Sequence, residues 1–341
     1  MQINLISSKE KWKETLTEFI SFDSFHTHDF HEISQANGEG TPLMFVASNN
    51  GIPLGCWPVL KRKIPNTDYF DFTSVYGYSG PLIKENIESA PIIEGIWNCM
   101  KDYGAISLFS RMHPLFEKSI SNEVHKGIHL SDVVIIDSEK SGDVLSHYRG
   151  SHRREIINAT KSGVSITIDM DCEHLDDFSK IYHDTMKNLN ATEYYHFSKQ
   201  YLSSMKSAKD FKTIILLAKY EGKIIAASMF ILSKCIMQYY LSGTNFEYRK
   251  LAPSKAIISK AHELAKSLGI RHLILGGGVG SAHDSLFKFK SGFSNIIKPF
   301  FITKKIFNEN IYQELCATNN INSSTEAYFP AYRLPKHNNS K

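Results

Sequence analysis

The segment from Ser242 to Ala256 places polar and basic residues where an apolar, strand-like run gives way to a helical pattern. The first residues of that helix, Ser254 to Ala256, would present unpaired backbone N–H groups, and a helix start of this kind binds phosphate or pyrophosphate. Arg249 and Lys250 add positive charge. A plain strand-to-helix connection with solvated basic side chains is the alternative. Because the segment lacks the glycines of a P-loop or a dinucleotide-binding turn, it does not favour those ligands.

A second segment with chemical potential follows the predicted strand 272–275. Three glycines, Gly276 to Gly278, let a ligand or another backbone approach closely. The short helix predicted around 284–291 would direct Lys288 or Lys290 towards the same edge, with Asp284 as its N-terminal cap. The alternative is a flexible turn followed by a half-exposed helix.

The N-terminal half contributes aromatic and basic candidates for ligand binding. Tyr76 and Tyr78 would stack on a sugar or base, and Arg111 would pair with a phosphate. Arg153, in the second half, would line a cleft or form a solvated ion pair. Tyr-Gly turns are also common structural features, and His113, which precedes a proline, would equally serve to hold a loop.

Apolar periodicity predicts two halves with a similar order of helix, hairpin, helix and strand. The tight turns are expected at Asn50-Gly51 and Glu221-Gly222. The pattern predicts helices at 7–22, 92–100, 175–189, 253–268 and 284–291, strands at 43–47, 52–60, 105–109, 133–136, 214–220, 224–232, 236–241 and 272–275, and a strand pair within 296–306. We expect an N-terminal domain at 1–148, a C-terminal domain at 149–327 and a loosely held polar tail at 328–341.

Composition excludes several classes of protein. Of 341 residues, 42 % are hydrophobic and 22 % charged, which predicts a folded chain, and a net charge of +4 is too small for a nucleic-acid footprint. The five cysteines are dispersed, so neither a disulfide framework nor a zinc site is expected. No apolar run approaches the ~20 residues needed to span a bilayer, and no secretory leader is evident. We expect a cytoplasmic protein.

The order of hairpin, third strand, Asn245-x-x-Tyr-Arg249, helix, strand, glycine triplet and Leu286-Phe-Lys-Phe-Lys-Ser-Gly-Phe293 resembles the GNAT acyltransferase domain of the Fem-like group, over about 149–306. The resemblance implies an α/β (α+β) fold of two tandem GNAT-like domains, each a mixed, mostly antiparallel sheet flanked by helices. It also implies that the turn into the main helix binds the pyrophosphate of coenzyme A and that the thioester lies at a splayed strand edge. The residues that it assigns to the donor are Asn245, Arg249, Lys250, Ser254, Lys255, Gly276 and Gly277.

The sequence departs from that family at one point and matches it at others. Arg249-Lys-Leu-Ala-Pro-Ser254 replaces the usual Arg/Gln-x-x-Gly-x-Gly/Ala pattern, which affects the exact phosphate contacts. Phe289-Lys290 resembles the Phe-Lys pair of Fem-type peptidoglycan aminoacyltransferases, whose lysine stabilises charge during transfer from aminoacyl-tRNA. The segments 71–81 and 110–114 resemble parts of the same Fem-like and polysaccharide-associated acyltransferases.

The resemblance predicts direct acyl transfer from acyl-CoA to an amine. The sequence shows no His/Asp/Glu cluster with metal-ligand spacing and no G-x-S-x-G elbow, so neither a metal nor a covalent intermediate is expected. The expected acceptor is an amino sugar, free or nucleotide-linked, of surface-polysaccharide (O-antigen) synthesis, bound by Tyr76, Tyr78, Arg111 and Arg153. Lys290 is the expected charge-stabilising residue, and the unranked candidate bases are His283, His196 and His113. The alternatives are a Fem-type, aminoacyl-tRNA-dependent peptidoglycan aminoacyltransferase and a non-catalytic GNAT-like binding module.

Overall fold

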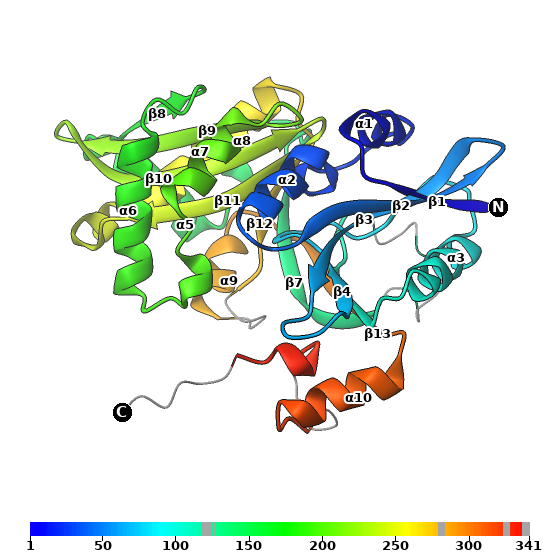
Figure 1. Cartoon of the computed structure of the whole chain (residues 1–341). Coiled ribbons are helices and arrows are strands. Elements are labelled where there is room, and N and C mark those ends of the chain that lie inside the picture. Colours follow the sequence, from blue (N-terminus) through cyan, green and yellow to red (C-terminus); the bar gives the residue numbers. More distant parts are fainter. Residues whose placement is uncertain (117–119, 121–124, 126, 279–283, 323–327, 336–341) are drawn as a thin grey trace. The chain divides into compact units, whose positions relative to one another are not determined.

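The computed structural model describes the chain except residues 117–119, 121–124, 126, 279–283, 323–327 and 336–341. Its contacts divide it into two compact units (Figure 1). The first contains Met1–Ile20, Phe25–Leu130 and Phe300–Lys341, and the second contains Ser21–Ser24 and Ser131–Pro299. Residues 131–148 thus pack in the second unit and residues 300–322 in the first, whereas the sequence pattern divides the chain at 148/149.

The first unit has a mixed sheet with the strand order β1-β2-β3-β4-β6-β13, and β5 pairs with β3. All pairs are antiparallel except β4 with β6. Its elements, in chain order, are β1 (Gln2–Ile6), α1 (Lys9–Thr17), α2 (His28–Ala36), β2 (Thr41–Asn49), β3 (Ile52–Lys63), β4 (Phe70–Thr73), β5 (Leu82–Ile83), α3 (Ser89–Asp102), β6 (Ser107–Arg111), the later part of β13 (Ile296–Ile306), α10 (Glu309–Thr318) and the 3-10 helix η7 (Ala331–Arg333).

The second unit has the strand order β7-β12-β11-β10-β9-β8, and its β11–β12 pair is parallel. Helix α6 packs on β10 and β11, and α8 packs on β9 and β10 (Figure 1). The elements are β7 (Ile128–Asp137), η3 (Val144–His147), α5 (Gly150–Lys161), β8 (Ser165–Asp169), α6 (Leu175–Asn188), η4 (Glu193–Tyr195), α7 (Lys199–Ser207), β9 (Lys212–Tyr220), β10 (Lys223–Ser233), β11 (Ile236–Thr244), η5 (Phe246–Leu251), α8 (Pro253–Ser267), β12 (His272–Gly276) and α9 (Ser285–Lys290).

Local sequence signals explain why the hairpins and α8 were predictable. Asn50 and Gly51 have φ of 49° and 79°, and Glu221 and Gly222 have φ of 48° and 75°, so each turn uses two left-handed residues. Pro253 starts α8. The predicted α/β fold class, with mostly antiparallel mixed sheets flanked by helices, is confirmed.

Several predicted boundaries are wrong. Residues 296–306 form one long strand instead of a strand pair, because Ile302 to Ile306 pair directly with β6. The predicted helix 7–22 ends at Thr17, and the sequence pattern missed α2, α7 and α10. Part of the supposed loose tail is packed, since Tyr332 is buried and its hydroxyl contacts Asp71 and Ser107.

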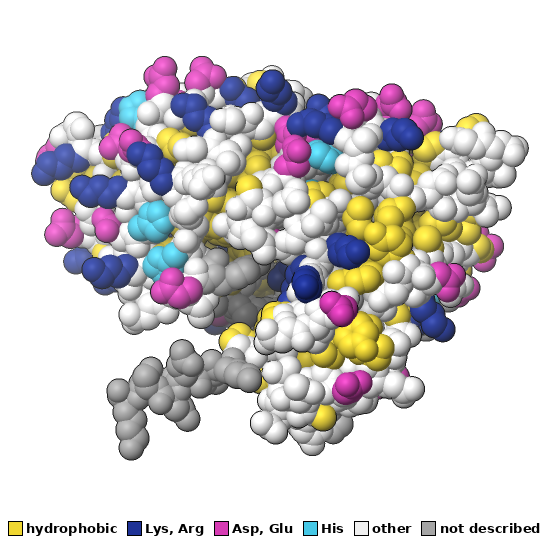
Figure 2. Space-filling view, viewed as in Figure 1, with side chains coloured by type: hydrophobic (Ala, Val, Ile, Leu, Met, Phe, Trp, Pro, Cys, Tyr) yellow, Lys and Arg dark blue, Asp and Glu magenta, His cyan; other side chains and the backbone are white. Residues whose placement is uncertain are grey.

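None of the helices in the described part of the chain is long and apolar enough to cross a membrane. On the face shown in Figure 2, basic and acidic side chains are intermixed, in keeping with the small net charge.

Candidate functional site

A divergence of two parallel strands forms the centre of the candidate site in the second unit. Strands β11 and β12 pair only at Ile236–His272, Met237–Leu273 and Gln238–Ile274. Beyond these pairs, β11 continues to Thr244 along β10, whereas β12 continues to Gly276 along β7. The edges of the two strands therefore separate, and a linear group can reach backbone atoms there that elsewhere in the sheet are bonded.

The turn from β11 into α8 lies at the end of this divergence. Asn245 caps η5 by accepting a hydrogen bond from the amide of Glu247 at 3.0 Å. Ala252 joins η5 to α8 in the left-handed conformation, with φ of 50° and ψ of 42°, a backbone state that usually selects glycine. The side chains of Arg249 and Lys250 are exposed on this turn.

The start of α8 offers fewer free amides than its sequence suggested. The amides of Lys255 and Ala256 both donate to the carbonyl oxygen of Ala252, at 3.0 and 3.3 Å. The expectation of three free N–H groups is therefore wrong for two of them. The carbonyl of a cap residue accepts the first intrahelical bond, here from Ala256, and Ala252 accepts a second bond from Lys255. Ser254 retains a hydroxyl that lies 2.7 Å from the hydroxyl of Thr244.

Charge near the helix start is partly neutralised. The ammonium of Lys255 lies 2.6 Å from the carboxylate of Glu155 on α5, so it is held in an ion pair. By contrast, Arg249 and Lys250 have no ion-pair partner within the described ranges. These two residues are the basic groups that remain available for an anionic ligand.

A cavity of about 770 Å³ adjoins the same turn, between α6, the β9–β10 turn and residues 244–247. Asn245 lines it, together with both acidic and basic residues of α6, including Lys180 and Asp184. Gly243 allows α6 to approach, because a Cβ there would lie 2.7 Å from the carbonyl oxygen of Ile181. Residues 244–247 of the turn are therefore accessible from this cavity.

The glycines at the end of β12 allow a close backbone approach. Gly276 has φ of +79°, and a Cβ on Gly277 would lie 2.7 Å from the carbonyl oxygen of Asp132. Both positions therefore require glycine, one for its conformation and the other for space. This agrees with the role that the sequence suggested for the glycine triplet, although ligand contact there remains a prediction.

Lys290 lies at the end of α9, buried to 9 % exposure, and its ammonium donates a hydrogen bond to the carbonyl oxygen of Gly277 at 2.8 Å. Burial lowers the pKa of Lys290 to about 8, and the nearby Asp284 carboxylate only partly opposes that shift. No carboxylate forms an ion pair with Lys290 within the described chain. A buried amine with this environment is unusual, and such groups cluster at functional sites.

Contacts from α5 hold α9 in place. Arg149 donates from its guanidinium to the carbonyl oxygen of Lys288 at 2.7 Å, and the His152 ring lies 2.8 Å from the carbonyl oxygen of Phe289. Asp284 caps the helix by accepting from the amide of Phe287 at 2.9 Å, as the sequence predicted. The position of Lys290 is therefore fixed by both ends of a short helix.

The candidate bases occupy different environments. His196 is half-buried, with its ring 6.2 Å from that of His183 in a stacked arrangement. His283 lies outside the described residues. His113 belongs to the first unit, where it is buried, stacks on Phe116 at 4.3 Å and accepts a hydrogen bond from the amide of Leu115.

The predicted acceptor residues are divided between the units. Tyr78 is half-buried against Phe300 in the first unit, and Tyr76 is also half-buried there. The guanidinium of Arg111, in the same unit, lies 5.0 Å from the Phe109 ring. In the second unit, Arg153 is exposed on α5 and forms no ion pair with any described side chain.

A buried carboxylate near the divergence was missed by the sequence analysis. Asp23 is fully buried and accepts hydrogen bonds from Ser233 and from Gln238, the last residue of β11 before the strands separate. It also accepts from the amide of Ser24. A single aspartate directly after the predicted helix 7–22 gives no sequence signal for this burial or for these hydrogen bonds.

Residues 146–289 match the sequence model of the acetyltransferase (GNAT) domain. FemX has a similar structure, with a TM-score of 0.72 at 12 % identity over 92 % of this chain and 99 % of that chain. The structure of L-PGS from Bacillus licheniformis gives 0.58 at 14 % identity over 92 % and 97 %. A tandem GNAT protein from the clavulanic acid biosynthesis pathway gives 0.52 at 8 % identity over 89 % and 98 %. No curated protein sequence matches this chain.

These comparisons support a GNAT-type acyltransferase fold. The matched residues include the whole strand divergence and the turn into α8, and end at Phe289, one residue before Lys290. Identities of 8–14 % establish a shared fold and no shared substrate.

Proposed function

We propose that the chain is an acyl-CoA-dependent N-acyltransferase whose transfer step takes place at the divergence of β11 and β12. The observation that carries the proposal is the buried Lys290 ammonium, which donates to the Gly277 carbonyl oxygen and has no ion-pair partner among the described residues. A cation held there can stabilise negative charge that develops on an acyl carbonyl, and burial strengthens that effect.

The turn into α8 is the proposed site of the coenzyme A pyrophosphate. Its support is the positive end of a fifteen-residue helix and the two exposed basic residues Arg249 and Lys250. The hydroxyl pair of Thr244 and Ser254 supplies further donors. Asn245, Lys255, Gly276 and Gly277 remain proposed donor-site residues, with Lys255 in the indirect position of an ion-paired side chain.

The reaction that we propose is direct. The deprotonated amine attacks the thioester carbonyl, a C–N bond forms, the C–S bond breaks, and coenzyme A leaves as its thiolate, which the proton lost by the amine then converts to the thiol. The amine proton passes to a base, for which His196, His113 and His283 remain the candidates. Lys290 has a pKa of about 8, so at neutral pH most of it is the ammonium that electrostatic stabilisation requires.

The proposed acceptor is an amino sugar, in the form of a nucleotide-linked amino-deoxysugar used in surface-polysaccharide synthesis in the cytoplasm. Its proposed contacts are Tyr76, Tyr78, Arg111 and Arg153. This step depends on the resemblance to polysaccharide-associated acyltransferases, and the half-buried aromatic side chain of Tyr78 is compatible with stacking on a sugar.

The second candidate is a Fem-type aminoacyltransferase that uses aminoacyl-tRNA. It is favoured by the Phe289-Lys290 pair and by the similarity to the FemX fold. An ester carbonyl would replace the thioester, and Lys290 would keep its role. The intermixed charge on the face in Figure 2 offers no broad basic surface for RNA there.

Calorimetric titration with acetyl-CoA and coenzyme A tests the choice of donor. We expect Arg249→Ala to weaken binding roughly tenfold, the effect of losing one charge-assisted contact. Lys234→Ala is the matched control, because Lys234 is an exposed lysine in the turn at the other end of β11. If neither ligand binds the wild type, the acyl-CoA proposal fails, and transfer from aminoacyl-tRNA becomes the reaction to assay.

Thiol release with a panel of amino sugars then tests the transfer step. We expect Lys290→Met to lower the rate about 10²-fold or more while donor affinity changes little, as for loss of an oxyanion-stabilising donor. Lys288→Met is the control, because Lys288 is exposed on the same helix. Equal rates for both variants would remove Lys290 from the mechanism.

A further inference from the structure

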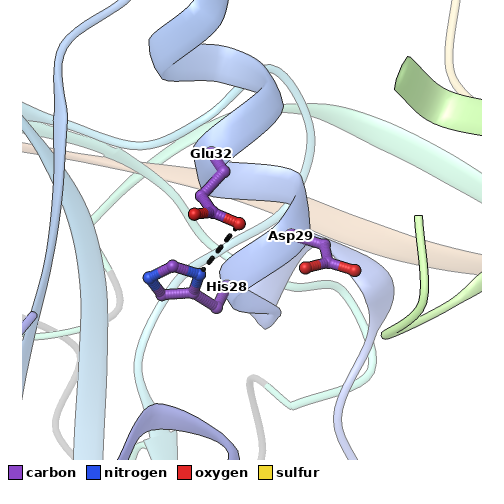
Figure 3. A group of neighbouring side chains, drawn as sticks. All are labelled: His28, Asp29 and Glu32. Atoms are coloured by element: carbon purple, nitrogen blue, oxygen red, sulfur yellow. Dashed lines mark ion pairs between the residues drawn. The ribbon is translucent and has the colours of Figure 1, made fainter. Parts of the chain in front are cut away.

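Three side chains with metal-ligating atoms converge on the first turns of α2 in the first unit. The Nδ1 of His28 and carboxylate oxygens of Asp29 and Glu32 lie within 4.8 Å of one another. Figure 3 shows the His28 ring and the Glu32 carboxylate facing each other, with Asp29 on the adjoining part of the same helix. The spacing of His28 and Glu32, four residues apart, places them on one helix face.

Two ordinary effects account for the carboxylates alone. Acidic residues stabilise the first turn of a helix through its dipole. In addition, the Lys9 ammonium on α1 contacts Asp29 and lies 3.3 Å from Glu32. The acidic pair by itself therefore indicates no ligand.

The imidazole of His28 is the feature that these effects leave unexplained. His28 is 6 % exposed, and its Nδ1 has no hydrogen-bond partner; the Glu32 oxygen 3.3 Å away is within ion-pair distance, marked by the dashed line in Figure 3, but outside hydrogen-bond geometry. The two atoms are close but are not aligned as donor and acceptor. A buried ring nitrogen without a partner is costly unless something else occupies its lone pair.

The separation of these two atoms fits two ligands of one metal ion. Ligands about 2.0–2.1 Å from a tetrahedral zinc ion lie roughly 3.3 Å apart. A ring of Trp12, 5.1 Å away and nearly perpendicular, fixes the plane of the His28 ring. The Glu32 side chain is 49 % exposed, so an ion can enter from solvent.

We propose that His28, Asp29 and Glu32 bind a divalent transition-metal ion of the zinc class, which displaces the Lys9 ammonium from the carboxylates. One imidazole nitrogen and two carboxylate oxygens are a ligand set that suits Zn²⁺, with the fourth position open to water. Lys9 is then the competing cation of the metal-free protein. A shift of the Asp29 side chain away from Lys9 brings the third ligand to the ion.

Titration of metal-free protein with Zn²⁺ by calorimetry, and with Co²⁺ by visible absorption, tests this site. We expect one ion per chain and a Co²⁺ spectrum of low coordination number. Glu32→Gln should weaken binding roughly tenfold or more, because it replaces an anionic ligand while the helix surface stays intact. Glu10→Gln on α1 is the control, since Glu10 is an exposed acid in the first turn of its helix and lies outside the cluster.

Lys9→Met provides a readout that a surface carboxylate pair would not give. We expect it to tighten Zn²⁺ binding, because the competing ammonium is gone. His28→Ala should abolish the Co²⁺ spectrum, and its folding is checked by circular dichroism. Absence of Zn²⁺ binding, binding unchanged by Glu32→Gln and His28→Ala, or equal affinity for Mg²⁺ and Zn²⁺ would overturn the proposal.

Discussion

Two buried ionisable side chains, Asp71 in the first unit and Lys290 in the second, are treated in opposite ways. The Asp71 carboxylate is fully buried and accepts from the guanidinium groups of Arg62 and Arg333, at 2.8 and 2.5 Å, and from the Tyr332 hydroxyl at 2.8 Å. Lys290 has a carbonyl oxygen as its partner and no carboxylate in an ion pair among the described residues.

The presence or absence of counter-ions distinguishes a charge that stabilises the fold from one that can take part in chemistry. A buried charge that is matched by opposite charges and hydrogen bonds holds elements together, and removing one partner is expensive. A buried charge without a counter-ion loses affinity for its proton, as the lowered pKa of Lys290 shows. Only a buried charge without a counter-ion can still stabilise opposite charge on a substrate.

The strongest test of this contrast is Asp71→Ala. We expect it to lower the free energy of unfolding by about 3–5 kcal/mol, because two guanidinium groups lose their buried partner. Chemical denaturation gives the value. Asp68→Ala, at an exposed aspartate in the β3–β4 connection, should change stability little, and an equal loss for both variants would show that the Asp71 network is not stabilising.

Replacing Lys290 should raise the free energy of unfolding, in contrast to Asp71→Ala, and the size of that effect should depend on pH. Its pKa of about 8 in the folded protein lies below the ordinary value of 10.5, so the unfolded chain binds more protons between these values and wild-type stability rises with pH there. The free-energy cost of burying the charged ammonium amounts to roughly 3 kcal/mol below pH 8, and it is absent above pH 10.5. Relative to Lys290→Met, the wild type should therefore gain stability from pH 7 to 10. A stability difference between the wild type and Lys290→Met that does not change with pH would show that no charged ammonium is buried there.

Tyr332→Phe offers the finest test, because it removes one neutral donor and leaves both arginines with Asp71. Burial and the Asp71 charge raise the pKa of the Tyr332 hydroxyl, so it stays protonated and donates. We expect a loss of about 1 kcal/mol by thermal unfolding. Tyr103→Phe, at an exposed tyrosine, is the control. A loss of stability as large as that of Asp71→Ala would show that the hydroxyl, and not the ion pairs, supplies most of the stabilisation.

Features set by local chemistry could be predicted from the sequence. The Asn50-Gly51 and Glu221-Gly222 turns and the start of α8 at Pro253 follow from backbone preferences of the residues themselves. The cap of α9 by Asp284 was predictable for the same reason.

Features set by distant contacts could not be predicted. Helix α2 was missed because its inward side includes polar residues, among them His28, Asp29 and His31, which break the apolar periodicity. Four-residue spacing brings His28 and Glu32 together only on a helix, so the sequence pattern offered no reason to pair them as the metal ligands that we propose. Arg62, Asp71 and Arg333 likewise carry no mutual signal in the sequence.

The candidate donor site was located from its order of elements, but its details were not. With Ala252 as the cap of α8, the bond from the Ala256 amide to its carbonyl follows from helix geometry, whereas the second bond, from the Lys255 amide, does not. Similarly, the sequence placed Lys290 on a helix aimed at the glycines, whereas its burial depends on the packing of α5 against α9.

The pairing of Asp71 with Arg333 also constrains the order in which the chain can be completed during synthesis. The two residues are separated by 262 positions, and Tyr332 and Arg333 follow every residue of the second unit in the chain. Until they emerge, Asp71 has only Arg62 as a charged partner from this network. The first unit, although it contains the N-terminus, therefore reaches its final charge balance only after the second unit has been translated in full.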